Sequence, residues 1–122
     1  MPPSKTPSKK VRRRPEFHLV AYYFARLSIG TTPPPVLGVT SLEMAYNRFY
    51  AKLGGGRPKS QFINSMRNAR AAFEAHMPTS SLPGWVDSSG KPFRKDAGVK
   101  KILDDWALRS DADLEKAALA YL

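Results

Sequence analysis

The sequence contains no cysteine and only two histidines, which excludes several kinds of site at once. Without thiols the chain forms no disulfide, has no thiolate nucleophile and cannot build a cysteine-rich zinc site. It also lacks a run of about 18 apolar residues, as a membrane-spanning helix requires, and the apolar stretch of a secretory signal. We therefore expect a soluble intracellular protein without a membrane partner, located in the cytoplasm or nucleoid of a bacterium or in the nucleus of a eukaryote.

Acidic residues are scarce, and their distribution along the chain is uneven. The chain has 10 acidic and 20 basic residues, for a net charge of +10. Residues 1–14 contain six bases and no acid, residues 15–77 seven bases and three acids, and residues 78–122 seven of each. The positive charge is thus concentrated in the N-terminal half, and we expect an anionic partner to bind there.

The composition predicts one folded domain preceded by a disordered tail. A chain of 122 residues, 42% hydrophobic and 11% aromatic, is long and apolar enough to bury a single core. Residues 1–14 are different, because three prolines and six cations leave almost nothing to bury. We expect a disordered basic arm over residues 1–14 and a single helical domain over residues 15–122.

Apolar residues recur at helical spacing in about five segments, and no segment alternates as a strand does. The expected helices cover residues 15–28, 41–53, 61–76 and 97–109, with a last helix after Ser110. Pro15 suits a first turn, the glycines at 54–56 would end the second helix, and Pro78 would end the third. The pattern predicts an all-α fold, a compact irregular bundle of about five helices.

Local signals also predict helix caps and core residues. Polar residues stand at N-cap positions before the four later helices, namely Thr40, Ser60, Asp96 and Ser110. Phe49, Phe73 and Trp106 fall on apolar stripes and are expected in the core. Residues 79–95 read as an irregular loop, with a short hairpin between Trp85 and Phe93 as the alternative. We expect Trp85 to pack over the core, and the alternative is an exposed ring on which a base could stack.

The basic arm carries the strongest functional signal. Cations beside phosphates release condensed counterions, and a disordered strand of cations can follow a nucleic-acid backbone without a rigid match. Short patterns leave alternatives open, because residues 9–12 resemble a nuclear-import signal, residues 6–10 resemble histone-tail repeats, and a tail can also aid solubility or bind an acidic protein. The predicted nucleic-acid contacts in the arm are Lys5, Lys9, Lys10, Arg12, Arg13 and Arg14.

The turn at residues 54–60 is the second candidate for phosphate binding. Its glycines let backbone N–H groups approach an oxyanion, and Arg57 and Lys59 add full charges before a helix start. A nucleotide-binding P-loop is excluded, because that motif follows a strand, whereas a helix is expected here and Pro58 interrupts the turn. The alternative is a glycine stop followed by a surface loop.

The helix expected over residues 61–76 offers side chains that are able to read bases. Asn64, Arg67, Asn68 and Arg70 lie opposite its apolar stripe, and arginine suits guanine as asparagine suits adenine. The helix-turn-helix motif is a poor match, because its helices are joined by three or four residues and this junction has about six. A solvated polar face is the alternative reading.

Catalysis has little support in the sequence. His18 and His76 stand in separate helices without partners at ligand spacing, and the acidic pairs at 104–105 and 111–113 are explained by helix capping and solubility. A metal-dependent nuclease would need such acids beside the basic surface. We expect no catalytic residue, metal or cofactor.

These observations favour a non-enzymatic nucleic-acid-binding protein. DNA is favoured over RNA, because no RNA-binding sheet or loop signature is present. The alternative is a helical protein–protein adaptor or assembly subunit, including a homo-oligomer, with the basic tail serving solubility or targeting. Steep weakening by salt would distinguish nucleic-acid binding from an aromatic protein interface.

Overall fold

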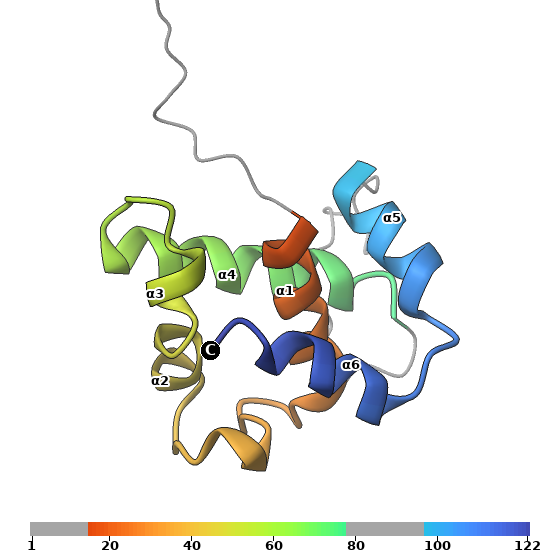
Figure 1. Cartoon of the computed structure of the whole chain (residues 1–122), viewed down its shortest axis with the longest axis horizontal. Helices are drawn as coiled ribbons and strands as arrows, with labels where there is room; N and C mark the ends of the chain where they lie inside the picture. The colour runs from red at the N-terminus through yellow and green to blue at the C-terminus, as the bar shows by residue number, and fades with distance from the viewer. Residues whose placement is uncertain (1–14, 78–96) are drawn as a thin grey trace, which may run out of the picture.

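The computed structural model describes residues 15–77 and 97–122, and these residues are helical without a β-strand. The predicted all-α fold is confirmed (Figure 1). The helices are α1 (Pro15–Leu27), the short 3-10 helix η2 (Pro35–Leu37), α2 (Leu42–Asn47), α3 (Tyr50–Leu53), α4 (Lys59–Glu74), α5 (Ala97–Trp106) and α6 (Asp111–Leu119). The predictions for residues 1–14, for the loop at 79–95 with Trp85, and for the Asp96 cap lie outside the described residues.

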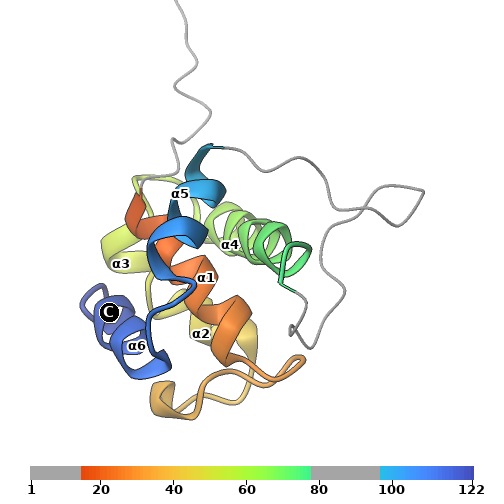
Figure 2. The same cartoon turned by 90° about the vertical axis from the view of Figure 1, so that its right-hand side faces the viewer.

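Helix α1 is the centre of the bundle. It packs most extensively on α4 and also contacts α5 and α6, so that α4 and α6 lie on opposite sides of it (Figures 1 and 2). Every residue from Phe17 to Ala25 is buried. A helix that is buried around its whole circumference, rather than along one apolar face, is a core helix.

Aromatic side chains fill the core around α1. The ring of Phe24 meets the rings of Tyr46 and Phe49 edge to face, with centroids 4.8 and 5.6 Å apart. Tyr22 packs on Phe73 in a tilted arrangement, with ring centroids 5.3 Å apart and an interplanar angle of 54°. Aromatic pairs favour such tilted geometry because a ring edge is electropositive and a ring face electronegative. The predictions that Phe49 and Phe73 are core residues are confirmed, since both are fully buried.

The helix predicted over residues 41–53 is divided into α2 and α3. The backbone N–H of Phe49 bonds to Tyr46 O, three residues back, which tightens the chain and directs the Phe49 ring into the core. The predicted cap at Thr40 is also wrong, because Ser41 has the extended N-cap backbone and its Oγ accepts from Met44 N at 3.1 Å. Burial of Phe49 thus outweighs the local preference for one continuous helix.

Two other helix boundaries test the predicted caps. Helix α4 begins at Lys59, with Pro58 at the N-cap position and no side-chain cap, so the predicted Ser60 cap is wrong. A proline there already has the extended backbone that an N-cap requires. The predicted Ser110 cap of α6 is confirmed, because Ser110 Oγ accepts from Asp113 N at 3.1 Å.

Trp106 is less buried than the sequence suggested. Its ring is half-buried at the edge of the core, and the Arg109 guanidinium carbon lies 4.3 Å from the ring centroid. We therefore expect Trp106→Ala to cost about 2 kcal/mol in the free energy of unfolding, below the roughly 3–5 kcal/mol of a fully buried aromatic residue. Urea denaturation measures this cost. An unchanged midpoint would show that the ring contributes nothing to the core.

Candidate nucleic-acid interface

The start of α1 packs beside the turn that joins α3 to α4. The ring centroids of Phe17 and Phe62 are 5.9 Å apart, and the Arg57 guanidinium carbon is 6.0 Å from the Phe17 ring. Residues 1–14, with six cations, join the domain at Pro15, two residues before this contact. The turn at residues 54–58 therefore packs against the first turns of α1, close to Pro15, where residues 1–14 join the domain.

The glycines of this turn are required by its backbone. Gly55 and Gly56 have φ of 63° and 83°, in the left-handed region that favours glycine. A Cβ on Gly54 would lie 2.6 Å from the carbonyl oxygen of Tyr50. The Tyr50 hydroxyl closes the turn by donating to Arg57 O at 2.5 Å. Turn geometry accounts for all three glycines, as the surface-loop alternative proposed.

The arrangement of helices around the turn agrees with the exclusion of a P-loop and with the poor match to a helix-turn-helix. The element before the turn is the helix α3, not a strand. The junction has five residues, 54–58, rather than about six, and this is still longer than the usual three or four. With α3 only four residues long, the pair lacks the first helix of a helix-turn-helix.

Arg57 is not the exposed phosphate ligand that the sequence suggested. Its exposed fraction is 8%. Its Nη1 donates to Ser65 Oγ at 2.7 Å, and its guanidinium lies over the Phe17 ring. The side chain thus ties the turn to α4 and α1. A guanidinium held in these contacts is withdrawn from the surface, so Arg57 does not belong to the exposed cations of the domain.

Arg70 is also internal, and the expectation that it belongs to the polar face of α4 is wrong. Arg70 and Glu74 are only 2% and 5% exposed. Arg70 Nε lies 2.8 Å from Glu74 Oε2, while its Nη2 donates to Gly30 O at 2.8 Å and its Nη1 to Tyr46 Oη at 3.4 Å. Burial raises the pKa of the Glu74 carboxyl, and the Arg70 charge opposes that rise. Arg70 therefore has a structural role, because it connects α4 to α2 and to the chain at Gly30.

The other predicted residues of α4 do reach the surface. Lys59, Asn64 and Arg67 are exposed, and Asn68 is partly exposed. The Lys59 Nζ lies 5.9 Å from the Tyr50 ring centroid, so this lysine extends over α3. The acid in α4, Glu74, is buried, and no negative charge of α4 offsets the cations. We call Lys59, Asn64, Arg67 and Asn68 the α4 basic face.

The two lysines of α5 are paired with acids one turn later. Lys100 Nζ lies 2.9 Å from Asp104 Oδ2, and Lys101 Nζ lies 3.1 Å from Asp105 Oδ2. In contrast, Lys59 and Arg67 form no ion pair within residues 15–77 and 97–122. Uncompensated charge in the described domain thus includes the α4 basic face, while α5 is locally neutral.

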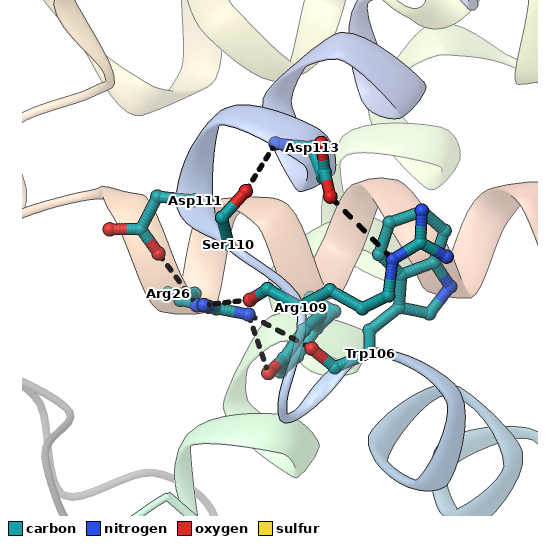
Figure 3. A network of polar contacts seen from close by, with 7 residues as sticks. Arg26, Trp106, Arg109, Ser110, Asp111 and Asp113 are labelled. Atoms are coloured by element: carbon teal, nitrogen blue, oxygen red, sulfur yellow. Dashed lines mark hydrogen bonds and ion pairs between the residues drawn. The ribbon is translucent and has the colours of Figure 1, made fainter.

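The corner between α5 and α6 contains a further neutral network (Figure 3). Arg26, at the end of α1, pairs with Asp111 at 2.8 Å and donates to Trp106 O and Arg109 O at 3.1 and 2.5 Å. Arg109 in turn lies 3.8 Å from Asp113. Arg26 thus connects the end of α1 to the corner between α5 and α6, and both arginines are paired with acids, which leaves little unpaired charge there to bind a polyanion.

Lys52, just before the turn, was not among the residues predicted from the sequence. Lys52, in the last turn of α3, is exposed and forms no ion pair within the described ranges. A single lysine in an amphipathic pattern does not predict a function. Only the fold shows that Lys52 lies beside the turn that leads into α4.

The two histidines lie in different parts of the fold. His18 is buried between the rings of Phe17 and Phe73, at 6.3 and 6.2 Å, and His76 is half-buried beyond the end of α4. Among the described residues, no three His, Asp or Glu side chains are grouped to hold a metal ion. A search of the same residues finds no helix with the length and apolarity to cross a membrane.

We compared the chain with protein-family models, with curated proteins and with solved structures, and none of the three comparisons finds a match.

Proposed function

We propose that the protein binds nucleic acid without catalysis, and that DNA is its preferred ligand. The observation that carries the proposal is the unpaired charge of the α4 basic face, together with the six cations of residues 1–14 that join the domain beside the α3–α4 turn. Cations arranged in this way displace counterions from a polyanion, which favours binding without a shaped pocket. Such a role places the protein inside the cell.

A protein–protein adaptor would bind through an apolar surface, and the described domain offers little of one. Within residues 15–77 and 97–122, the aromatic rings that could form such an interface are buried or half-buried. The exposed large apolar side chains are Ile29, Val36, Met44 and Leu108. Scattered apolar residues of this kind are ordinary on protein surfaces. Charge therefore supports a nucleic-acid partner better than apolar area supports a protein partner.

Removing two charges from the α4 basic face tests the proposal. We expect Lys59→Gln with Arg67→Gln to weaken DNA binding and to lower the slope of log affinity against log salt by up to about 1.8, because each lost phosphate contact contributes about 0.9. The free energy of unfolding should change by less than about 1 kcal/mol, since both side chains are exposed and unpaired in the described domain. Fluorescence anisotropy at several salt concentrations measures the slope.

The matched control is Lys100→Gln with Lys101→Gln. It makes the same change in net charge on side chains that are 65% and 67% exposed, but that are paired with Asp104 and Asp105. We expect the control to retain nearly the whole salt slope. Equal losses in the two double variants would show that net charge, and not the α4 basic face, determines binding.

A further inference from the structure

The described surface lacks the aromatic platforms on which single-stranded nucleic acids stack. Proteins that bind single strands combine a basic groove with exposed aromatic rings, and base stacking on those rings supplies much of the affinity. In residues 15–77 and 97–122, every Phe, Tyr and Trp is buried or half-buried. Tyr50 and Trp106, two of the half-buried rings, are approached by Lys59 and Arg109. The described domain therefore offers charge to a backbone but no free ring to a base.

The α4 basic face is rigid, and its charges have a fixed spacing. Phe62, Met66 and Phe73 hold α4 against the core with no exposed area. Lys59 and Arg67 are eight residues apart, which corresponds to about 12 Å along a helix axis. The major groove of B-form DNA is about 12 Å wide and admits an α-helix. A helix lying in this groove can bring exposed cations near its start and middle to the regularly spaced phosphates of a duplex, an arrangement that a flexible single strand does not present.

The side chains between these cations also suit a groove. Asn64 is exposed three residues before Arg67, and Asn68, which is partly exposed, lies one turn after Asn64 on the same side of the helix. Ala71, one further turn along, is small and half-buried. This face therefore presents neither an acid nor a bulky residue that would keep α4 away from base edges. The deep, narrow major groove of an RNA duplex does not admit side chains in this way.

We infer that the ligand is duplex DNA, with α4 along the major groove and Lys59 and Arg67 on the phosphates that flank it. The inference rests on the proposed function and specifies its ligand. Residues 1–14 contribute additional contacts with the backbone through their six cations. In this proposal α4 contributes the part of the affinity that depends on the duplex form, whereas the cations of residues 1–14 contribute affinity for any polyanion.

The experiment compares a short DNA duplex, one of its strands, and the RNA duplex of the same sequence. The full-length chain, Lys59→Gln with Arg67→Gln, and the control Lys100→Gln with Lys101→Gln are each titrated at several salt concentrations. We expect the unaltered chain to bind the DNA duplex most tightly. The α4 variant should lose up to about 1.8 of salt slope on the DNA duplex and much less on the other two ligands, while the control keeps the unaltered pattern.

Two results would overturn the inference, and they differ from a failure of the proposed function. Tighter binding to the single strand or to the RNA duplex would exclude duplex DNA as the preferred ligand while leaving nucleic-acid binding in place. Equal loss on all three ligands would show that α4 contacts a polyanion without regard to its form. Absence of binding to any of the three would instead refute the proposed function.

Discussion

Deletion of residues 1–14 is expected to lower DNA affinity steeply and to reduce the salt slope by up to about 5.4, because six cations are removed and each phosphate contact contributes about 0.9. Folding should be almost unaffected. Helix α1 begins at Pro15, and its buried residues begin at Phe17, so the deletion removes none of the core residues of the described domain. Anisotropy measured across salt concentrations gives the slope, and thermal unfolding followed by circular dichroism gives the stability.

A full-length variant with all six cations replaced by glutamine separates charge from chain length. Because counterion release depends on charge, this variant should behave like the deletion. If it keeps the affinity of the unaltered chain, the arm acts through something other than its cations. If the variant that lacks residues 1–14 binds DNA as tightly as the unaltered chain, the proposed DNA contacts are limited to α4.

The positions of helices could be predicted from the sequence where the local pattern and the tertiary packing agree. The five predicted segments all contain helix, and Ser110 caps α6 because a serine followed by an acid at the third position satisfies free backbone N–H groups locally. The break between α2 and α3 could not be predicted in this way. Phe49 turns inward to meet Phe24, and that contact joins positions far apart in the chain.

The exposure of the candidate residues in α4 could also be predicted only in part. Lys59, Asn64 and Arg67 are exposed where their helical positions place them. Arg70 sits next to these positions on the helical face, yet its partners include Gly30 and Tyr46, which only the fold brings near. Its spacing to Glu74 was a usable signal, since an arginine four residues before a glutamate forms an ion pair in a helix. Sequence alone did not indicate that the pair is buried.

The buried pair gives the largest expected effect on stability. Arg70→Met should lower the free energy of unfolding by roughly 3–5 kcal/mol at neutral pH, because it leaves the Glu74 carboxylate buried without its cation. That is a large part of the 5–15 kcal/mol that ordinarily stabilises a domain. Replacing both residues, as Arg70→Met with Glu74→Met, should recover most of the loss, since an apolar pair has no charge to desolvate.

The loss of unfolding free energy in Arg70→Met should depend on pH, and the titration of Glu74 determines whether the loss grows or shrinks as the pH rises. In the unaltered chain burial raises the pKa of this carboxyl and Arg70 lowers it, so removing Arg70 leaves only the raising effect. A carboxyl whose pKa is higher in the folded state stabilises the fold below its ordinary value of 4.5 and loses that contribution as pH rises through the folded-state value. Arg70→Met should therefore be least destabilising in acid and most destabilising at neutral pH.

Glu74→Gln in the Arg70→Met background isolates this titration. The amide keeps the shape of the carboxyl but binds no proton, so the difference in unfolding free energy between the two variants should shrink as the pH falls toward 4.5. Urea denaturation at a series of pH values measures that difference, and all other titrating groups are common to both proteins. A difference that stays constant with pH would mean that Glu74 reaches water once Arg70 is gone. The pair would then be held at the surface by its mutual attraction rather than enclosed by Tyr46 and the chain at Gly30.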